Sequence, residues 1–434
     1  MAAVRVAPVP LLRGTIQVPP DKSLTHRALM LAAVSDRDVR IGRPLESEDT
    51  AATLGAVEAC GAAAEGRLGE AITVSGRGLR GLRPPPAIDC ANAGTLMRLF
   101  AGLLVGQPTD QVVLDGDASL RTRPMTRIAR PLRAMGAEVF TAPGGTPPIV
   151  VAGRARLAGI THDLEVASAQ VKSCILLAGL FAEGTTWVRE PAPSRDHTER
   201  MLEAAGVPLL REGGAIGLTG PVAGLSLPDV EVPGDFSSAA AHLVAGALLG
   251  EPEVRLDGVN LNPGRTGLLG VMRRMGVDVR EEPGAPVAGE PCGALVVSRT
   301  EGLRATEVAP EEVPAMIDEL PLVGLLGAVA EGTTVVRGAA ELRVKESDRI
   351  ASVVRALRAL GVDAREREDG FEVHGGAGVE GGAMESVGDH RLAMLGAVAG
   401  LVSREGVSVG GFEAVAVSYP GFARDLAALG GVPA

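Results

Sequence analysis

The chain has 434 residues, a formal net charge of −11 and a hydrophobic content of 46%. Its length allows two or three domains with large cores. Acidic charge and an aromatic content of only 2% argue against a nucleic-acid or membrane-surface binder, which would show a basic face. Any anionic ligand must therefore be held by a local group of cations.

The sequence shows neither an export signal at residues 1–14 nor a membrane-spanning run. Residues 1–14 lack a charged stretch followed by an apolar one, so we expect no signal peptide. The apolar runs are shorter than the roughly 18 residues of a membrane span. We therefore expect a cytoplasmic protein.

Six apolar segments recur along the chain, and each is rich in Ala, Leu and Gly on every side. They are Ala28–Val34, Leu96–Val105, Val171–Ala182, Ala239–Leu249, Leu320–Ala330 and Leu392–Val402. A helix that is apolar all round belongs in a core. Each segment precedes a short β-rich run such as "QVVLDG" or "TTVVRG". The sequence therefore predicts six buried helices, each followed by a strand.

A second, amphipathic helix follows each of these strands and ends at a glycine. "DRIASVVRALRALG" shows the helical spacing of apolar positions, and glycine is the usual residue just beyond a helix end. The six terminal glycines are Gly61, Gly136, Gly206, Gly276, Gly361 and Gly430. We interpret the chain as six βαβαββ repeats, which an ordinary doubly wound α/β protein would not produce.

Two similar segments, "VPPDKS" and "VPGDFS", lie three repeats apart. Pro and Gly suit places where the chain passes between domains. We therefore predict a domain of repeats 1–3 at residues 20–232. A second domain would hold residues 1–19 and 233–434, with crossovers near 18–22 and 230–235.

Polar and charged residues gather at the starts of the six apolar helices, in "DKSLTHR", "NAGTLMR", "SAQVKS", "DFSS", "DELP" and "DHRLAM". Helix capping alone accounts for Ser, Asp and Asn at such points, and stays an equal alternative for any one of them. It does not account for Lys22, Arg27, Gln170, His390 and Arg391. Helix N-termini combined with cations indicate a site for small polyanions.

Three loops after the β-runs add further basic groups. They read "GDASLRTRPM", "PSRDHTERM" and "ELRVKESDR". A solvated helix face would explain a lone Arg, but the last loop holds Lys345, one of only three lysines beside Lys22 and Lys172. No P-loop is present, and no GxGxxG follows a strand and opens a helix. The one GxSxG match, in "GVSVGG", is part of a β-rich run and not a strand-to-helix elbow.

Cysteine and histidine usage gives no metal signature. Cys60, Cys90, Cys174 and Cys292 lie far apart with no CxxC, and the six histidines show neither HxxxH nor HExxH spacing. We expect buried thiols and no metal site.

These motifs, in this order and over essentially the whole chain, resemble the EPSP synthase family of enolpyruvyl transferases. The resemblance implies a two-domain inside-out α/β barrel of six repeats, three per domain, with the active site in the interdomain cleft. It also implies transfer of the enolpyruvyl group of phosphoenolpyruvate (PEP) to the 5-hydroxyl of shikimate 3-phosphate, with release of phosphate. Such an enzyme serves aromatic amino acid biosynthesis, needs no metal or organic cofactor, and is expected to be a monomer.

The resemblance assigns residues to each substrate. The expected contacts of shikimate 3-phosphate are Lys22, Ser23, Arg27, Ser168, Ala169, Gln170, Ser194, Arg195, Asp318 and Lys345. The expected contacts of PEP are Lys22, Asn92, Gly94, Thr95, Arg123, Gln170, Arg349 and Arg391. Paired arginines suit this role because guanidinium forks bind carboxylate and phosphate in a bidentate manner.

The chemistry of the reaction indicates a catalytic set of Lys22, Asp318, Glu346 and His390. A hydroxyl is a poor nucleophile, so a carboxylate must take its proton, and Asp318 is the candidate base. The methylene carbon of PEP must gain a proton, giving a tetrahedral ketal. Glu346 and Lys22 are the candidate donors, and the sequence leaves the choice between them open.

The chain departs from part of the family at one PEP contact, where Val417 replaces a C-terminal Lys. It keeps Gly94, where glyphosate-tolerant forms of the similar branch carry Ala, so we hypothesise that it is a glyphosate target. Three alternatives stay open. They are the sister enzyme acting on UDP-N-acetylglucosamine, a paralogue acting on another phosphorylated alcohol, and a non-catalytic anion-binding repeat protein.

Overall fold

The computed structural model describes residues 3–153, 156–287 and 289–431. The chain forms two compact units, each described here by itself. Unit 1 takes in the described residues of Met1–Pro19, Pro233–Ala285 and Pro291–Ala434. Unit 2 takes in those of Pro20–Val232 and Pro286–Glu290. The chain therefore enters unit 2 twice.

The centre of unit 2 is made of three buried helices, α1 (Lys22–Ala33), α3 (Gly94–Leu104) and α5 (Ala169–Gly179). Helix α3 contacts both α1 and α5. At Gly102 the approach to α5 is so close that an added Cβ would lie 2.3 Å from the carbonyl oxygen of Cys174. Glycine is therefore required there by packing.

Three helices, each with one face buried, and three sheets cover this centre. The helices are α2 (Glu48–Ala59), α4 (Thr126–Ala134) and α6 (His197–Ala204). The sheets have the orders β14-β3-β5-β4, β6-β7-β9-β8 and β10-β11-β13-β12. In each, the first pair of strands is parallel and the others are antiparallel.

The strands of unit 2 have the following bounds: β3 (Val39–Gly42), β4 (Ala64–Arg67), β5 (Ala71–Val74), β6 (Ala87–Asp89), β7 (Gln111–Asp115), β8 (Glu138–Thr141), β9 (Ile149–Ala152), β10 (Thr161–Asp163), β11 (Gly184–Arg189), β12 (Leu210–Glu212), β13 (Ala215–Gly220) and β14 (Val230–Glu231). The last strand, β14, pairs with β3 from the first repeat, Val230 opposite Ile41. The final strand of the unit thus completes the sheet of its first repeat.

Unit 1 repeats the arrangement around α7 (Phe236–Leu249), α9 (Leu320–Val329) and α11 (His390–Val402). All 14 residues of α7 are buried. The three helices contact one another. The covering helices are α8 (Gly267–Arg274), α10 (Arg349–Ala359) and α12 (Phe422–Ala428).

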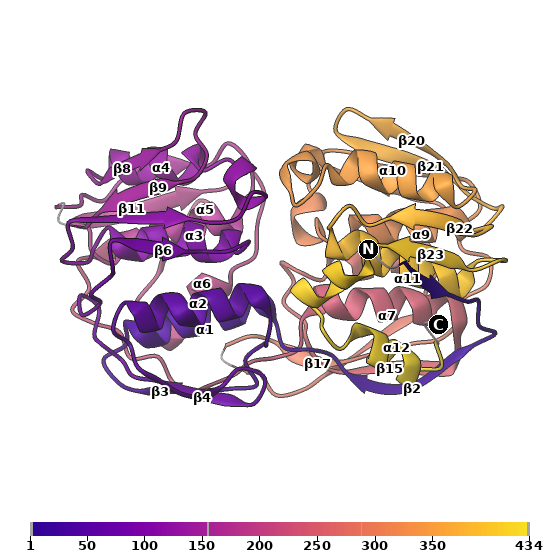
Figure 1. The fold of residues 1–434 in the computed structure, drawn as a ribbon, viewed down its shortest axis with the longest axis horizontal. Coiled ribbons are helices and arrows are strands. Elements are labelled where there is room, and N and C mark those ends of the chain that lie inside the picture. Colours follow the sequence, from indigo (N-terminus) through magenta and orange to yellow (C-terminus); the bar gives the residue numbers. More distant parts are fainter. Residues whose placement is uncertain (1–2, 154–155, 288, 432–434) are drawn as a thin grey trace. The chain divides into compact units, whose positions relative to one another are not determined.

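The sheets of unit 1 have the orders β16-β17-β15-β2, β18-β19-β21-β20 and β1-β23-β22. Their strands are β1 (Val4–Val6), β2 (Leu12–Gln17), β15 (Gly250–Asn260), β16 (Val279–Pro283), β17 (Cys292–Val297), β18 (Glu307–Val308), β19 (Thr333–Val336), β20 (Asp363–Arg367), β21 (Gly370–His374), β22 (Gly382–Glu385) and β23 (Val407–Gly410). Strand β2, drawn in indigo in Figure 1, runs parallel beside β15 and joins the N-terminal segment to this unit.

Four short 3₁₀ helices lie in loops of the described chain: η1 (Leu120–Thr122), η2 (Val313–Ala315), η3 (Ala340–Val344) and η4 (Phe412–Val417). Together the elements confirm the six repeats that the sequence predicts, three in each unit. They also confirm that the apolar helices lie inside and the sheets outside. No described helix is long and apolar enough to cross a membrane.

The predicted helix-terminating glycines are confirmed. All six adopt positive φ, from 84° at Gly361 to 101° at Gly430. The four cysteines, all described, are buried thiols, as expected. Burial raises the pKa of Cys60 and of Cys174 to about 12, so these thiols stay protonated at neutral pH.

Gly270, within α8, and Gly276, just after it, test the argument that a helix-terminating position with positive φ requires glycine. An added Cβ would meet nothing within 4 Å at either, but Gly276 has φ +100° whereas Gly270 lies inside the helix. We expect Gly276→Ala to lower the free energy of unfolding by about 1 kcal/mol through left-handed strain. Gly270→Ala should raise it by about 0.5–1 kcal/mol. Urea unfolding of both variants measures the difference, and equal effects would contradict the assignment of φ.

Candidate active site

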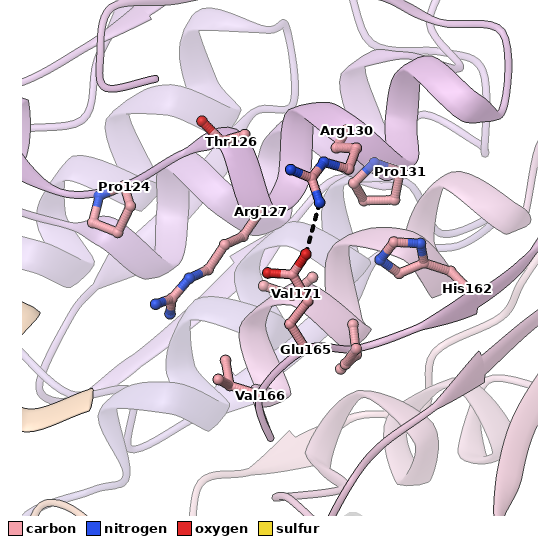
Figure 2. Close-up of a pocket in the computed structure, with 10 residues that line it drawn as sticks. Pro124, Thr126, Arg127, Arg130, Pro131, His162, Glu165, Val166 and Val171 are labelled. Atoms are coloured by element: carbon pink, nitrogen blue, oxygen red, sulfur yellow. Dashed lines mark hydrogen bonds and ion pairs between the residues drawn. The ribbon is translucent and has the colours of Figure 1, made fainter. Parts of the chain in front are cut away.

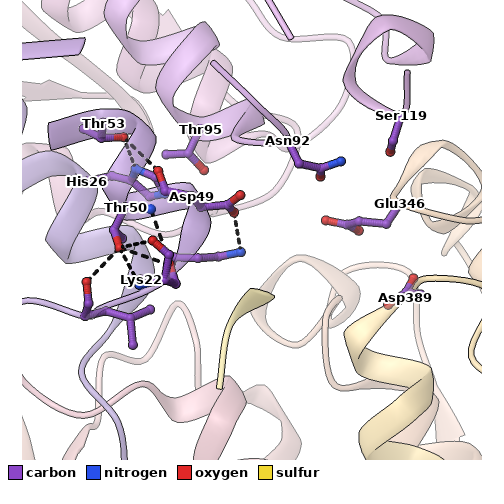
Figure 3. A network of polar contacts seen from close by, with 12 residues as sticks. Lys22, His26, Asp49, Thr50, Thr53, Asn92, Thr95, Ser119, Glu346 and Asp389 are labelled. Carbon is purple, nitrogen blue, oxygen red and sulfur yellow. Dashed lines mark hydrogen bonds and ion pairs between the residues drawn. The ribbon is translucent and has the colours of Figure 1, made fainter. Parts of the chain in front are cut away.

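Lys22 opens α1, directly after the capping residue Asp21, whose Oδ1 accepts a hydrogen bond from the Leu24 amide at 2.9 Å. The Lys22 side chain is mostly buried, with 18% exposed, and its Nζ lies 2.8 Å from Oδ2 of Asp49 on α2. Figure 3 shows the Lys22 ammonium directed at this carboxylate. The lysine is thus held in place by a buried counterion.

His26 lies one turn further along α1 and bonds through Nδ1 to the hydroxyl of Thr53 at 2.6 Å (Figure 3). Burial lowers the pKa of His26 to about 3 despite the attraction of Asp49. The imidazole is therefore neutral at physiological pH and adds no charge beside Lys22.

Arg27 ties α1 to the third repeat. Its Nε donates to Thr198 at 2.7 Å and its Nη2 to Ser173 at 3.0 Å, and Ser173 and Thr198 also bond to each other. Burial lowers the pKa of Arg27 to about 10, so the guanidinium stays charged at neutral pH. A buried cation with a fixed orientation is well suited to hold an anion.

The starts of α3 and α5 meet through Gln170. Its Nε2 donates to Thr95 at 2.9 Å, and its Oε1 accepts from Arg98 at 2.6 Å. Ser168 caps α5, its Oγ accepting from the Val171 amide at 3.4 Å. Residues predicted from two separate motifs are thus brought together here.

Arg123 lies just after η1 and is buried, with its Nη2 donating to Oδ1 of Asn92 at 2.6 Å. Asn92 in turn donates to Asp117 at 2.7 Å. A Cβ added at Gly94 would lie 3.2 Å from Nη1 of Arg123, which is tighter than ordinary contact. Glycine at position 94 therefore leaves room for this guanidinium.

Lys172, which the sequence left without a role, is 3% exposed and lies between two carboxylates. Its Nζ is 2.7 Å from Glu190 and 2.7 Å from Glu199. Burial alone would lower the pKa of Lys172, but attraction to Glu199 and Glu190 outweighs burial and raises it. The hydroxyl of Ser194 also donates to Glu190. This buried cluster therefore positions Ser194, one of the predicted phosphate contacts.

In unit 1, Arg349 opens α10 and is 1% exposed, in contact with three carboxylates. They are Asp318 at 3.0 Å, Glu346 at 2.6 Å and Asp389 at 2.8 Å. Burial alone would lower the pKa of Arg349, but these three carboxylates outweigh burial and raise it. Arg349 therefore holds both predicted acid–base carboxylates in one cluster.

The remaining predicted residues of unit 1 surround this cluster. Lys345 Nζ lies 3.8 Å from Asp318. Asp389 caps α11 by accepting from the Arg391 amide at 2.9 Å, and Arg391 Nη1 donates to the carbonyl of Ser237 at 2.9 Å. His390 is 3% exposed at the same helix start.

The predicted site residues thus form one set in each unit. Unit 2 holds Lys22, Ser23, Arg27, Asn92, Gly94, Thr95, Arg123, Ser168, Ala169, Gln170, Ser194 and Arg195, and unit 1 holds Asp318, Lys345, Glu346, Arg349, His390 and Arg391. Val417 ends η4 in unit 1. Arg121, by contrast, is 57% exposed and pairs with Asp115, as the solvated-surface alternative predicted, and Arg343 forms a half-buried pair with Asp348.

Sequence reasoning missed the counterions Asp49, Glu190 and Asp389. Each is an acid near a helix start or after a strand, where capping or solvent exposure is the ordinary interpretation. Only their partners, distant in sequence, show that they are the counterions of mostly buried cations.

A further group of potential ligand atoms, from Asp196, His197 and Glu290, lies within 4.8 Å in unit 2. His197 Nδ1 is 2.7 Å from Glu290, both fully buried, and Asp196 is 2.8 Å from Nε of Arg200. These contacts account for the group as a structural cluster. They hold the segment Pro286–Glu290 in unit 2, although the flanking strands β16 and β17 belong to unit 1.

Comparison with solved structures gives the class of protein. An enolpyruvyl transferase from Streptomyces tendae matches with a TM-score of 0.79 at 20% identity, over 100% of this chain and 98% of that one, which shows a shared fold. EPSP synthase from Acinetobacter baumannii matches with a TM-score of 0.88 at 41% identity, over 100% and 99% of the two chains.

The family model of EPSP synthase (3-phosphoshikimate 1-carboxyvinyltransferase) matches residues 6–426. Relatives of that name from Halorhodospira halophila and Thermus thermophilus are both 48% identical over 98% of this chain, covering 96% and 98% of their own lengths. The chain belongs to the EPSP synthase family, which confirms the resemblance of its motifs and the predicted fold class.

The buried cluster around Lys172 makes a stability prediction. Lys172→Met removes the cation between Glu190 and Glu199 and leaves two buried carboxylates without it. We expect a loss of roughly 3–5 kcal/mol, or a fall in Tm of about 10 °C. The matched control is Arg189→Gln, which breaks an exposed pair with Asp163 and should cost less than about 1 kcal/mol. Calorimetry of both variants tests this, and a Lys172→Met protein as stable as the control would contradict it.

Proposed function

We propose that this chain transfers the enolpyruvyl group of PEP to the 5-hydroxyl of shikimate 3-phosphate, giving 5-enolpyruvylshikimate 3-phosphate and phosphate. The observation that carries the proposal is the match to the family over residues 6–426, with the predicted motif residues at the buried-helix starts and adjoining loops of both units. A non-catalytic anion-binding protein would not require Asp318 and Glu346 on the same arginine.

Shikimate 3-phosphate takes its phosphate contacts from unit 2 in this proposal. Ser168, Ala169 and Gln170 offer the first turn of α5, where amide N–H groups and the helix dipole favour an anion. Ser194 and Arg195 offer a hydroxyl and a guanidinium. The Ser194 hydroxyl must turn from Glu190 to the phosphate, leaving Glu190 paired with Lys172.

The ring hydroxyls of shikimate 3-phosphate are bound by Asp318 and Lys345 of unit 1. PEP is bound by Arg123, Arg349 and Arg391, together with Lys22 and Gln170. Because Arg349 already contacts three carboxylates, the PEP carboxylate must exchange with at least one of them. That exchange costs little Coulomb energy, since one carboxylate replaces another on the same guanidinium.

The reaction balances as an addition followed by an elimination. The 5-hydroxyl oxygen bonds to C2 of PEP and its proton passes to Asp318, while the PEP methylene carbon takes a proton from Glu346 or Lys22. The resulting ketal then loses a proton from the new methyl group, and the C–O bond to phosphate breaks. The group that donated the first proton accepts the second, and the proton held by Asp318 passes to the leaving phosphate, which restores the enzyme.

The direct test is phosphate release from the purified protein mixed with shikimate 3-phosphate and PEP. We expect turnover with this pair and none when UDP-N-acetylglucosamine replaces shikimate 3-phosphate. Turnover with UDP-N-acetylglucosamine and PEP, but not with shikimate 3-phosphate and PEP, would contradict the proposal and indicate the activity of the sister enzyme. No phosphate release with either acceptor would favour a paralogue acting on another phosphorylated alcohol.

Lys22→Arg tests proton transfer by Lys22. Arginine keeps the charge beside Asp49 but does not release a proton at accessible pH. We expect kcat to fall by about 100-fold with an unchanged Tm. The control is Arg40→Lys, which exchanges the cation of an exposed pair with Glu231 and should leave kcat unchanged. Near-normal kcat in Lys22→Arg would remove Lys22 from the proton donors.

Gly94→Ala tests the glyphosate hypothesis. The new Cβ would lie 3.1 Å from Nη1 of Arg98 and 3.2 Å from Nη1 of Arg123, so both guanidinium groups must shift. We expect the inhibition constant of glyphosate to rise by roughly tenfold, and the KM of PEP by less, because PEP is the smaller molecule. Gly55→Ala, where a Cβ meets nothing within 4 Å, is the control. A native protein indifferent to millimolar glyphosate would refute the hypothesis.

A further inference from the structure

A cavity of about 240 Å³ lies in unit 2 between the start of α4 and the segment that runs from β10 to α5. Much of its wall is apolar. Pro124 and Pro131 lie on the α4 side, and Leu164, Val166 and Val171 lie on the other. Val166 is one of the few large apolar side chains exposed to solvent, at 37%. The cavity therefore offers an apolar surface that solvent can reach.

The polar groups of the same cavity are two arginines, a histidine and a glutamate. Figure 2 shows Arg127 and Arg130 on α4, with Arg130 directed at Glu165 across the cavity. Burial lowers the pKa of His162, so its imidazole is neutral at pH 7 and contributes a hydrogen bond rather than a charge. Arg130 and Glu165 thus supply a cation and a carboxylate that face each other at the cavity.

The Arg130–Glu165 pair is open to exchange. Its atoms are 2.7 Å apart, but 65% and 78% of the two side chains are exposed. Exposed ion pairs of this kind contribute little free energy, because water and salt screen the attraction between the charges. A ligand carboxylate that also buries apolar atoms against Pro131 and Leu164 would therefore displace Glu165 from Arg130.

The size of the cavity restricts the ligand. At about 240 Å³ it is smaller than the cavities that hold drug-sized molecules or cofactors, which are roughly 300–1,000 Å³. A nucleotide is too large. Inorganic phosphate would gain nothing from the apolar wall. What remains is a small organic anion with one carboxylate and a compact apolar body.

We propose that this cavity is a second binding site, separate from the residues assigned to the substrates, which takes a small aromatic or branched aliphatic monocarboxylate. The carboxylate binds Arg130 in place of Glu165, and the apolar body lies against Pro131, Leu164 and Val171. The cavity adjoins two segments with predicted substrate residues, because Pro124 follows Arg123 and Val171 follows Gln170. The proposal stands on these contacts and does not rest on the activity proposed above.

The test uses 4-fluorobenzoate as the probe and ¹⁹F NMR titration as the measurement. We expect a dissociation constant on the order of 1 mM for the native protein. Arg130→Gln should weaken binding at least fivefold, because the carboxylate loses its cation. Glu165→Gln should tighten binding by about threefold, because the competing carboxylate is gone. Arg189→Gln, which breaks a similar exposed pair outside the cavity, should change nothing.

Two further probes distinguish the site from other modes of binding. 4-Fluorobenzyl alcohol, which lacks the charge, should bind more weakly and respond to neither variant. Inorganic phosphate should not displace the fluorobenzoate. The proposal is overturned if both variants bind the probe like the native protein, as binding at the substrate residues would require. Displacement of the fluorobenzoate by phosphate would also overturn the proposal. So would the absence of binding at a fluorobenzoate concentration ten times the expected dissociation constant. Circular dichroism of each variant confirms that it is folded.

Discussion

Six helices with apolar side chains on every face impose the constraint on which the rest of this structure depends. Such helices cannot lie on a surface, so each unit must cover three of them with sheets and amphipathic helices. Polar chemistry can then occur only at their ends. The N-terminal ends, where amide N–H groups are unpaired within the helix, carry the predicted substrate residues.

Buried cations at or near these ends would be unstable alone, and three of them lie beside carboxylates. Lys22 has Asp49, Lys172 has Glu190 and Glu199, and Arg349 has three acids. In the proposed function, such pairs would let a chain of net charge −11 bind anionic substrates. The positive groups are oriented before a substrate arrives, and the desolvation of each charge is offset by its partner rather than by the ligand.

The repeat, the buried helices and the terminating glycines could be predicted because each leaves a local signature. Gly276, for example, follows an amphipathic run and must adopt positive φ, whatever the rest of the chain does. The counterions could not be predicted. Glu190 contacts Lys172, 18 residues away, and nothing near it in sequence separates it from an exposed acid. The contact between Glu290 and His197, 93 residues away, likewise cannot be predicted from the sequence.

In the proposed reaction, the cluster around Arg349 would link substrate binding to the chemistry. Asp318, the proposed base, accepts a hydrogen bond from Nη1 of Arg349, and such a bond stabilises the charged carboxylate and makes it a weaker base. If the PEP carboxylate takes this guanidinium, Asp318 loses that bond and becomes a stronger base as the second substrate binds. Glu346, released from Nη2 in the same exchange, becomes easier to protonate and so better able to act as an acid. The same arginine would thus keep both groups inactive until PEP is bound, which restricts proton transfer to the complex that contains PEP.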